Sequence, residues 1–232
     1  AFATRESFNQ AVWANRPDFI LHSGDLVEGT GAQAEQFAYF LRGQDERDFI
    51  HWFPVLYAEG NHDQGGPYFD AYIYEVQDAR YGAEVRGDCS MDCGGLHISL
   101  MNSGPWGLGE MNAETAGKPA DAGTLREIAA AEAWLRKDLS GERAKQAMFR
   151  LLVRHHPYSD TYTARHIPAI AEPGRVDLLL AGHTHSYARY VSADPSVGAG
   201  TVYITQQDAR VYSARGDYCL MDVDFQKELM TL

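Results

Sequence analysis

Two histidines separated by one residue follow an apolar run late in the chain. The run Val176-Asp177-Leu178-Leu179-Leu180 leads into Ala181-Gly182-His183-Thr184-His185. Such a run is typical of a buried strand, and Gly182 would end it, leaving both imidazoles in the turn after its carboxyl end. Open α/β sheets bind ligands at that edge. The pair would bind one metal ion or belong to two neighbouring ions; alternatively, one histidine packs and the other faces water.

Three other apolar runs also end in side chains of the kinds that bind metal ions. Residues 18–22 lead into Gly24-Asp25, residues 53–58 into Gly60-Asn61-His62-Asp63, and residues 148–153 into His155-His156-Pro157. If these runs are neighbouring strands, their carboxyl ends meet at one edge of a sheet. The sequence therefore predicts that an aspartate, an asparagine and several histidines gather there.

The predicted donors combine oxygen and nitrogen atoms: a carboxylate, an amide and imidazoles. This mixture suits zinc, manganese or iron, and it suits calcium or a thiolate cluster poorly. Asp25 has two carboxylate oxygens and can bridge two ions, whereas Asn61 offers a single neutral oxygen to one ion.

Strands alternating with amphipathic helices must position these side chains. Residues 96–101, 201–205 and 218–223 also alternate like strands, whereas three segments have the apolar spacing of helices. The predicted helices are residues 6–14, 33–42 and 125–139. The Gly- and Ala-rich residues 104–123 are predicted to form a long functional loop or an insertion. No repeat or linker divides the chain, which favours one domain of the α/β class.

The composition is globular and acidic. The chain has 232 residues, of which 45% are hydrophobic and 22% charged, and a net charge of −12. Nucleic-acid binding depends on lysine and arginine contacts to phosphates, so this charge argues against a nucleic-acid partner. No apolar stretch is long enough to indicate a membrane span. A small phosphate ester remains compatible, because bound metal ions reverse the local field.

Two of the three cysteines are close in sequence. Cys89 and Cys93 would form either a short-loop disulfide or two unpaired thiols, and the spacing leaves both open. Cys219 stands alone in a predicted strand. Three cysteines exclude a four-cysteine zinc site.

Together, the strand-end motifs resemble those of the calcineurin-like metallophosphoesterases. Their order and spacing match from about residue 17 to about residue 223, which is nearly the whole chain. The resemblance implies a four-layer α/β fold, in which a two-sheet β-sandwich is flanked by helices on both faces and a dinuclear metal centre lies at the strand ends. Tyr187-Ala188-Arg189 is most similar to the purple acid phosphatase branch.

The resemblance also implies which residues bind each ion. Asp25 would be the bridging carboxylate, and His185 would bind the second ion. The first ion would be bound by Asn61, His155 and His183. The choice of His155 over His156 follows from its position two residues before a proline.

For the reaction, the resemblance implies hydrolysis of phosphomonoesters or phosphodiesters by a water that bridges two divalent or trivalent ions of zinc, manganese or iron. The substrate would be a small phosphate ester. His62 would act as a general acid at the leaving-group oxygen or stabilise the transferring phosphoryl group, with Asp63 as its orienting partner.

Two departures from the family pattern qualify this interpretation. The purple branch has a tyrosine ligand three residues after the bridging aspartate, where this chain has Glu28, so a purple ferric site is not expected. The family's first motif, Asp-x-His after the first strand, is absent, and the late Asp224-Phe225-Gln226 falls in a predicted terminal hairpin.

We therefore expect residues 1–232 to form a single metallophosphoesterase domain that lacks its first strand. That strand is either missing from this fragment or lost, in which case Asp25 and His185 hold the second ion weakly. The rival interpretation is a non-catalytic or mononuclear protein that binds phosphate or metal.

Overall fold

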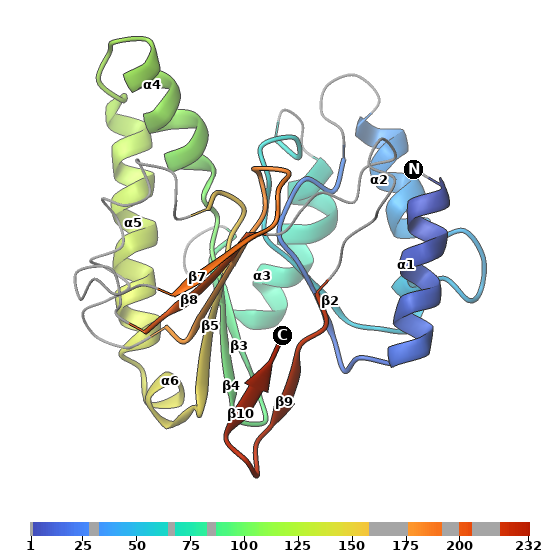
Figure 1. The fold of residues 1–232 in the computed structure, drawn as a ribbon. Helices are drawn as coiled ribbons and strands as arrows, with labels where there is room; N and C mark the ends of the chain where they lie inside the picture. The colour runs from blue at the N-terminus through green and yellow to red at the C-terminus, as the bar shows by residue number, and fades with distance from the viewer. Residues whose placement is uncertain are drawn as a thin grey trace.

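The large sheet of the protein has six strands in the order β3-β4-β5-β6-β8-β7 (Figure 1). The computed structural model describes residues 2–27, 33–64, 68–82, 87–157, 176–191, 200–205 and 219–232. The strands of this sheet are β3 (Cys89–Cys93), β4 (Leu96–Leu100), β5 (Phe149–Val153), β6 (Leu178–Ala181), β7 (Ala188–Val191) and β8 (Val202–Thr205). Because β4, β5, β6 and β8 are mutually parallel, their carboxyl ends share one edge.

Two smaller sheets accompany the large one. In the first, β1 (Ile20–His22) pairs in parallel with β2 (Val55–Tyr57), and in the second, β9 (Asp222–Asp224) pairs antiparallel with β10 (Leu229–Thr231). Apolar side chains of both small sheets pack against one face of the large sheet. The two small sheets therefore form the second layer of a β-sandwich.

Helices cover both outer faces of this sandwich. On one side lie α4 (Met111–Thr115) and α5 (Ala122–Leu139), and on the other lie α1 (Phe2–Asn15) and α2 (Gln33–Arg42) (Figure 1). The remaining helical segments are η1 (Phe49–His51), η2 (Asp70–Tyr74), α3 (Glu75–Tyr81), η3 (Pro105–Glu110) and α6 (Glu142–Gln146). The four-layer α/β architecture expected from the sequence is confirmed.

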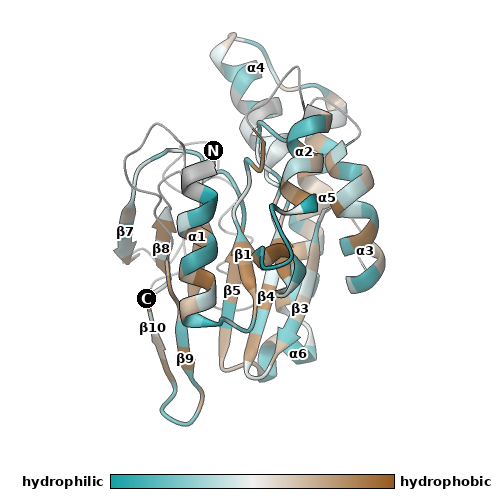
Figure 2. Ribbon diagram, turned by 90° about the vertical axis from the view of Figure 1, so that its right-hand side faces the viewer, coloured by the Kyte–Doolittle hydropathy of each residue, from teal (hydrophilic) through white to brown (hydrophobic). Residues whose placement is uncertain are grey.

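The alternation of apolar residues in β5 shows how the layers are held together. Leu151 and Val153 are buried between the two sheets, whereas Leu152 points to the opposite face and packs with Leu135 of α5. All three β5 side chains are fully buried. A strand buried on both faces is apolar throughout, and the central strands are correspondingly brown in Figure 2.

The sequence prediction missed the start of α5 and the structure before it. Asp121 caps α5 by accepting hydrogen bonds from the backbone N–H groups of Gly123 (2.7 Å) and Thr124 (3.0 Å). This N-cap extends the predicted helix at its amino end. Residues 104–123, predicted to be a loop, contain the π-helix η3 and the short helix α4.

The structure also decides between the two alternatives for the cysteines. Cys89 and Cys93 are the first and last residues of β3, and both are free thiols. Four residues of extended strand span about 14 Å, which is far more than the roughly 7 Å that a disulfide tolerates between Cα atoms. The disulfide alternative is therefore wrong. None of the described helices is both long enough and apolar enough to cross a membrane.

Candidate metal centre

Four side chains from four separate strand ends converge at one edge of the sandwich. Asp25 follows β1, Asn61 follows β2, His155 follows β5 and His183 follows β6. The Nε2 atom of His155 lies 3.0 Å from Asn61 Oδ1, 3.3 Å from Asp25 Oδ2 and 3.3 Å from His183 Nδ1. Asn61 Oδ1 is also 2.9 Å from His183 Nδ1. The structure thus brings together two oxygen and two nitrogen donors from distant parts of the chain.

The second nitrogen of His155 determines what its first nitrogen can do. His155 Nδ1 lies 2.7 Å from the backbone carbonyl oxygen of Ser23, which only accepts hydrogen bonds. Nδ1 therefore carries the proton in the neutral ring, and Nε2 presents a lone pair to Asp25, Asn61 and His183. A histidine that donates its outer N–H to a carbonyl is the usual arrangement around protein-bound metal ions.

Glycines allow the strand ends to approach this closely. A Cβ atom on Gly60 would lie 2.2 Å from both the backbone nitrogen and Oδ1 of Asp25. Gly24 has a φ of 97°, and a Cβ there would lie 2.5 Å from His155 Nδ1. The glycines before Asp25 and Asn61 are therefore required by the packing of the site.

The predicted ligands also adopt unusual backbone conformations. Asp25, His183 and His185 have φ values of 57°, 70° and 55°, in the left-handed region that residues other than glycine rarely adopt. Such conformations cost on the order of 1–3 kcal/mol each and tend to cluster at functional sites. Three of them at one edge of the sandwich mark this edge as the candidate site.

Asp63 fixes the loop that contains Asp25. Its Oδ2 accepts hydrogen bonds from the backbone N–H groups of Asp25 and Gly60, both at 2.9 Å, and its Oδ1 accepts from those of Leu26 (2.7 Å) and Val27 (3.2 Å). Burial raises the pKa of Asp63 to about 6, although these hydrogen bonds oppose the rise. The sequence predicted Asp63 as the orienting partner of His62. In the structure, the Asp63 carboxylate accepts hydrogen bonds from the backbone of the Asp25 loop and of Gly60.

The electrostatics of the site favour an ionised Asp25. Burial alone would raise the pKa of Asp25, but a protonated His155, whose Nε2–H then donates to Asp25, lowers it to about 2, together with the backbone N–H of His62. The neighbouring His22 has its pKa lowered to about 4, first by burial and then by the charge of His155. The site therefore holds Asp25 as a carboxylate anion and, close to it, His22 as a neutral buried imidazole.

The other predicted site residues lie in different surroundings. The backbone N–H of His62 donates to Asp25 Oδ1 at 2.9 Å, which places His62 beside the convergence. His185 is exposed, and among the described residues it is not one of the histidines whose ring nitrogens lie close enough to share one ion. Asp224 lies at the end of β9 in the terminal hairpin, where it binds Lys227, and Glu28 lies outside the described residues.

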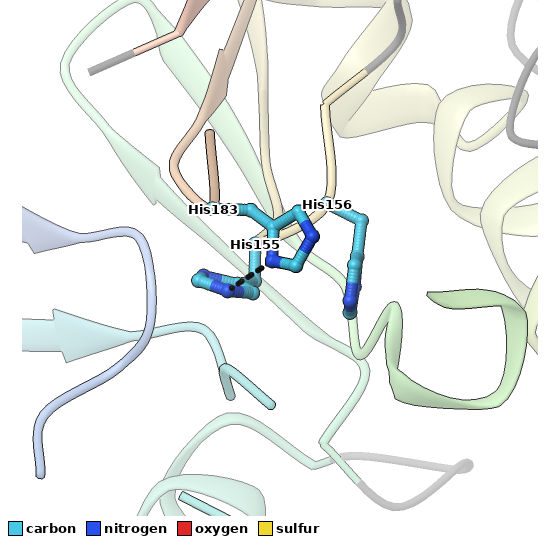
Figure 3. Close-up of side chains that lie close together, drawn as sticks. All are labelled: His155, His156 and His183. Carbon is cyan, nitrogen blue, oxygen red and sulfur yellow. Dashed lines mark hydrogen bonds between the residues drawn. The ribbon is translucent and has the colours of Figure 1, made fainter. Parts of the chain in front are cut away.

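Sequence reasoning missed a fifth strand end, and it set His156 aside in favour of His155. Among the described residues, the histidines whose ring nitrogens lie close enough to share one ion are His155, His156 and His183 (Figure 3). His156 is held by Ser103, which follows β4. The signal was the same as at the other strand ends: the polar Asn102 and Ser103 directly follow an alternating apolar run.

The four converging donors fit a metal ion of the predicted kind. A carboxylate oxygen, an amide oxygen and two imidazole nitrogens form a mixed set that suits zinc, manganese or iron. The carbonyl of Ser23 fixes the tautomer of His155 that such an ion needs. Asn61, His155 and His183 could thus share one ion, with Asp25 beside them at 3.3 Å from His155 Nε2, while a second ion would need His185.

Comparison with known proteins supports the fold and identifies the family. A dimetal phosphatase from Danio rerio has a similar fold, with a TM-score of 0.58 at 14% sequence identity over 89% of this chain and 77% of that chain. No curated protein matches the sequence. The family model of the calcineurin-like phosphoesterases matches residues 2–187, which include all the converging ligands. The chain therefore belongs to the calcineurin-like phosphoesterase family, whose members hydrolyse phosphoesters with the help of metal ions.

Proposed function

We propose that this protein hydrolyses small phosphoric esters at a dinuclear metal centre built on Asp25, Asn61, His155, His183 and His185. The observation that supports it best is the convergence of donors around His155 Nε2, within 3.0–3.3 Å of Asn61, Asp25 and His183. The phosphatase from Danio rerio, which has a similar fold, is described as a dimetal enzyme, in line with two ions.

The ligands divide between two positions. Asn61, His155 and His183 would hold the first ion, His185 would hold the second, and the carboxylate of Asp25 would serve both. Two ions in such a site supply a nucleophilic water at neutral pH and neutralise the charge that develops on the phosphoryl oxygens. Since Asp25 Oδ1 already accepts the backbone N–H of His62 at 2.9 Å, the bridging carboxylate keeps a fixed orientation.

His62 has a separate task in this proposal. Its backbone N–H donates to Asp25 Oδ1 at 2.9 Å, so the residue lies directly beside the bridging carboxylate. From there its imidazole donates a proton to the leaving-group oxygen or stabilises the transferring phosphoryl group. Asp63 supports this step by holding the Asp25 loop through three backbone hydrogen bonds and its own loop through a fourth, to Gly60.

We also propose that residues 1–232 behave as one metallophosphoesterase domain. The support is a continuous core: residues of β2, β4, β5, β6 and β8 share a single cluster, and Met221, Val223 and Met230 pack against it. The amino- and carboxyl-terminal parts thus depend on the same apolar contacts.

Metal add-back tests the reaction directly. The chain is stripped with a chelator and then supplied with zinc, manganese or iron, and the release of nitrophenol is followed from a nitrophenyl monoester and a bis-nitrophenyl diester. We expect hydrolysis of at least one ester, restored only by added metal. A metal-loaded protein that cleaves neither ester class contradicts the proposal.

One observation favours a second candidate, a mononuclear protein that binds phosphate without turnover. His185 is exposed and is not one of the described histidines whose ring nitrogens lie close enough to share one ion, so the second ion has fewer described ligands than the first. One ion per chain by elemental analysis, phosphate binding by calorimetry and no ester cleavage would identify this alternative.

A further inference from the structure

A buried histidine beside the candidate metal centre has no role in the reaction proposed above. His156 and Ser103 are both fully buried. Ser103 Oγ lies 2.9 Å from His156 Nδ1 and accepts the backbone N–H of the same residue at 3.0 Å. The hydroxyl thus holds His156 at two points, and both the backbone and the ring orientation of this residue are fixed.

The far edge of the His156 ring is confined as well. A Cβ atom on Gly107 would lie 2.0 Å from Nε2 and 2.2–2.3 Å from the adjacent ring carbons of His156. Gly107 belongs to the π-helix η3, a conformation that is often found at functional sites. The ring is therefore enclosed between Ser103 at Nδ1 and the backbone of Gly107 at Nε2, so it cannot rotate without moving η3.

This fixed ring packs against His183. The ring centroids of His156 and His183 are 4.6 Å apart with an interplanar angle of 48°, and the ring centroid of His155 lies 5.0 Å from that of His156 at 82° (Figure 3). His183 has a left-handed backbone and follows the last residue of β6 by two positions. Its ring is half-buried, so its orientation toward Asn61 depends on neighbouring side chains.

We propose that His156, held by Ser103, is a positioning residue that fixes the imidazole of His183 in its metal-binding orientation. The inference rests on the proposed metal centre and adds a supporting residue, Ser103, that none of the four strand-end motifs contains. Outer partners of this kind typically change metal affinity by about 10–100-fold when they are removed.

The experiment compares two ways of breaking the contact. Ser103→Ala removes the hydroxyl but keeps the ring, whereas His156→Asn retains an amide near the Nδ1 position but removes the ring surface against His183. Ser103→Thr keeps the hydroxyl and serves as the conservative rescue. Ser99→Ala is the matched control, because Ser99 is equally buried and its Oγ donates to Asp138 at 2.6 Å, away from the converging ligands.

Cobalt(II) is the probe, because its visible absorption reports both occupancy and ligand geometry. For each variant of the chain, Co²⁺ affinity and spectrum are measured after metal removal, together with the thermal unfolding of the metal-free protein. We expect Ser103→Ala and His156→Asn to bind Co²⁺ about 10–100-fold more weakly. Ser103→Thr should restore most of the affinity, and Ser99→Ala should lower thermal stability without changing the affinity.

Three results would overturn the inference. The first is a Ser103→Ala variant that binds Co²⁺ as tightly as the wild type. The second is a Ser99→Ala variant that weakens Co²⁺ binding as much as Ser103→Ala does, because the loss of affinity would then follow from general destabilisation. The third is a spectrum of His156→Asn that has lost one nitrogen ligand while that of Ser103→Ala is unchanged, which would make His156 itself a ligand. A wild type that binds no Co²⁺ contradicts the metal centre as well, which separates failure of the proposed function from failure of this inference.

Discussion

At the scale of single residues, Gly60 and Asp25 approach each other so closely in the candidate site that no side chain fits between them. A Cβ atom on residue 60 would overlap the backbone nitrogen and Oδ1 of Asp25, each at 2.2 Å. The backbones of Asp25 and Gly60 cannot move apart easily, because the N–H group of each donates a hydrogen bond to the Asp63 carboxylate. The smallest possible side chain at position 60 should therefore displace the bridging carboxylate.

The first prediction is that Gly60→Ala lowers metal affinity by about tenfold or more, as expected when a ligand is displaced. The measurement is metal per chain by elemental analysis after dialysis. Gly82→Ala is the control, since Gly82 has a φ of 69° but a methyl group there would meet no atom within 4 Å. It should cost stability through backbone strain and keep its metal. Wild-type metal content in Gly60→Ala would contradict the assignment.

The second prediction separates binding from proton transfer. His62→Asn should reduce turnover by about 10²–10⁴-fold with metal content near the wild-type level, because its backbone N–H, which contacts Asp25, is retained. Asp25→Ala should release metal, because it removes the carboxylate beside His155 Nε2. Turnover and metal content, measured on the same samples, test both variants. Loss of metal from His62→Asn would contradict the assignment of proton transfer to His62 and metal binding to Asp25.

At the scale of elements, strand ends were more predictable than the segments between them. Apolar runs that end in side chains able to bind metal located β1, β2, β5 and β6, because buried strands contain mostly apolar residues. The region of η3 and α4 was not predictable by the same rule. Its glycines and alanines give no clear helical period, and η3 is a π-helix that packs Gly107 on His156. The position of η3 is a consequence of tertiary contact.

The third prediction concerns the two-faced strand β5. Leu152→Ala should lower the free energy of unfolding by about 2–5 kcal/mol, because Leu152 is fully buried in the cluster under α5. The measurement is urea unfolding followed by circular dichroism. The control Leu125→Ala truncates a leucine that is 48% exposed and should change stability by about 0.5 kcal/mol or less. Equal losses in the two variants would contradict the layer assignment.

The fourth prediction concerns a buried histidine outside the metal centre. His97 of β4 lies between two carboxylates, with Nδ1 2.9 Å from Asp92 and Nε2 3.0 Å from Asp138. Burial opposes its protonation, but the hydrogen bonds and charges of Asp138 and Asp92 outweigh this and raise the pKa of His97 above 6.5. Its stabilising contribution is therefore complete below pH 6.5 and is lost as the pH rises through the folded-state pKa.

Unfolding free energies of the metal-free protein between pH 6 and pH 9 test this prediction. The wild type should lose more stability over this range than His97→Gln, which has no proton to release. The difference between the two curves isolates His97 from the histidines of the metal centre. Parallel curves would mean that His97 is not the titrating group.

At the scale of the whole molecule, the parallel strands connect residues that are distant in sequence. Ser23 and His155 are 132 positions apart, yet a 2.7 Å contact between them sets the tautomer of a metal ligand. The sequence predicted that Asp25, Asn61, His155 and His183 would meet, since parallel strands end at one edge. It could not predict that His156 packs on His183, because that contact depends on how Ser103 and Gly107 are placed by β4 and η3.

The fifth prediction is the position of the ion. Anomalous diffraction from crystals soaked in zinc would locate it directly. We expect a peak within about 2.0–2.2 Å of Asp25 Oδ2, Asn61 Oδ1, His155 Nε2 and the coordinating nitrogen of His183, with any second peak between Asp25 and His185. A zinc-soaked crystal with no peak among these four side chains would contradict the proposed metal centre.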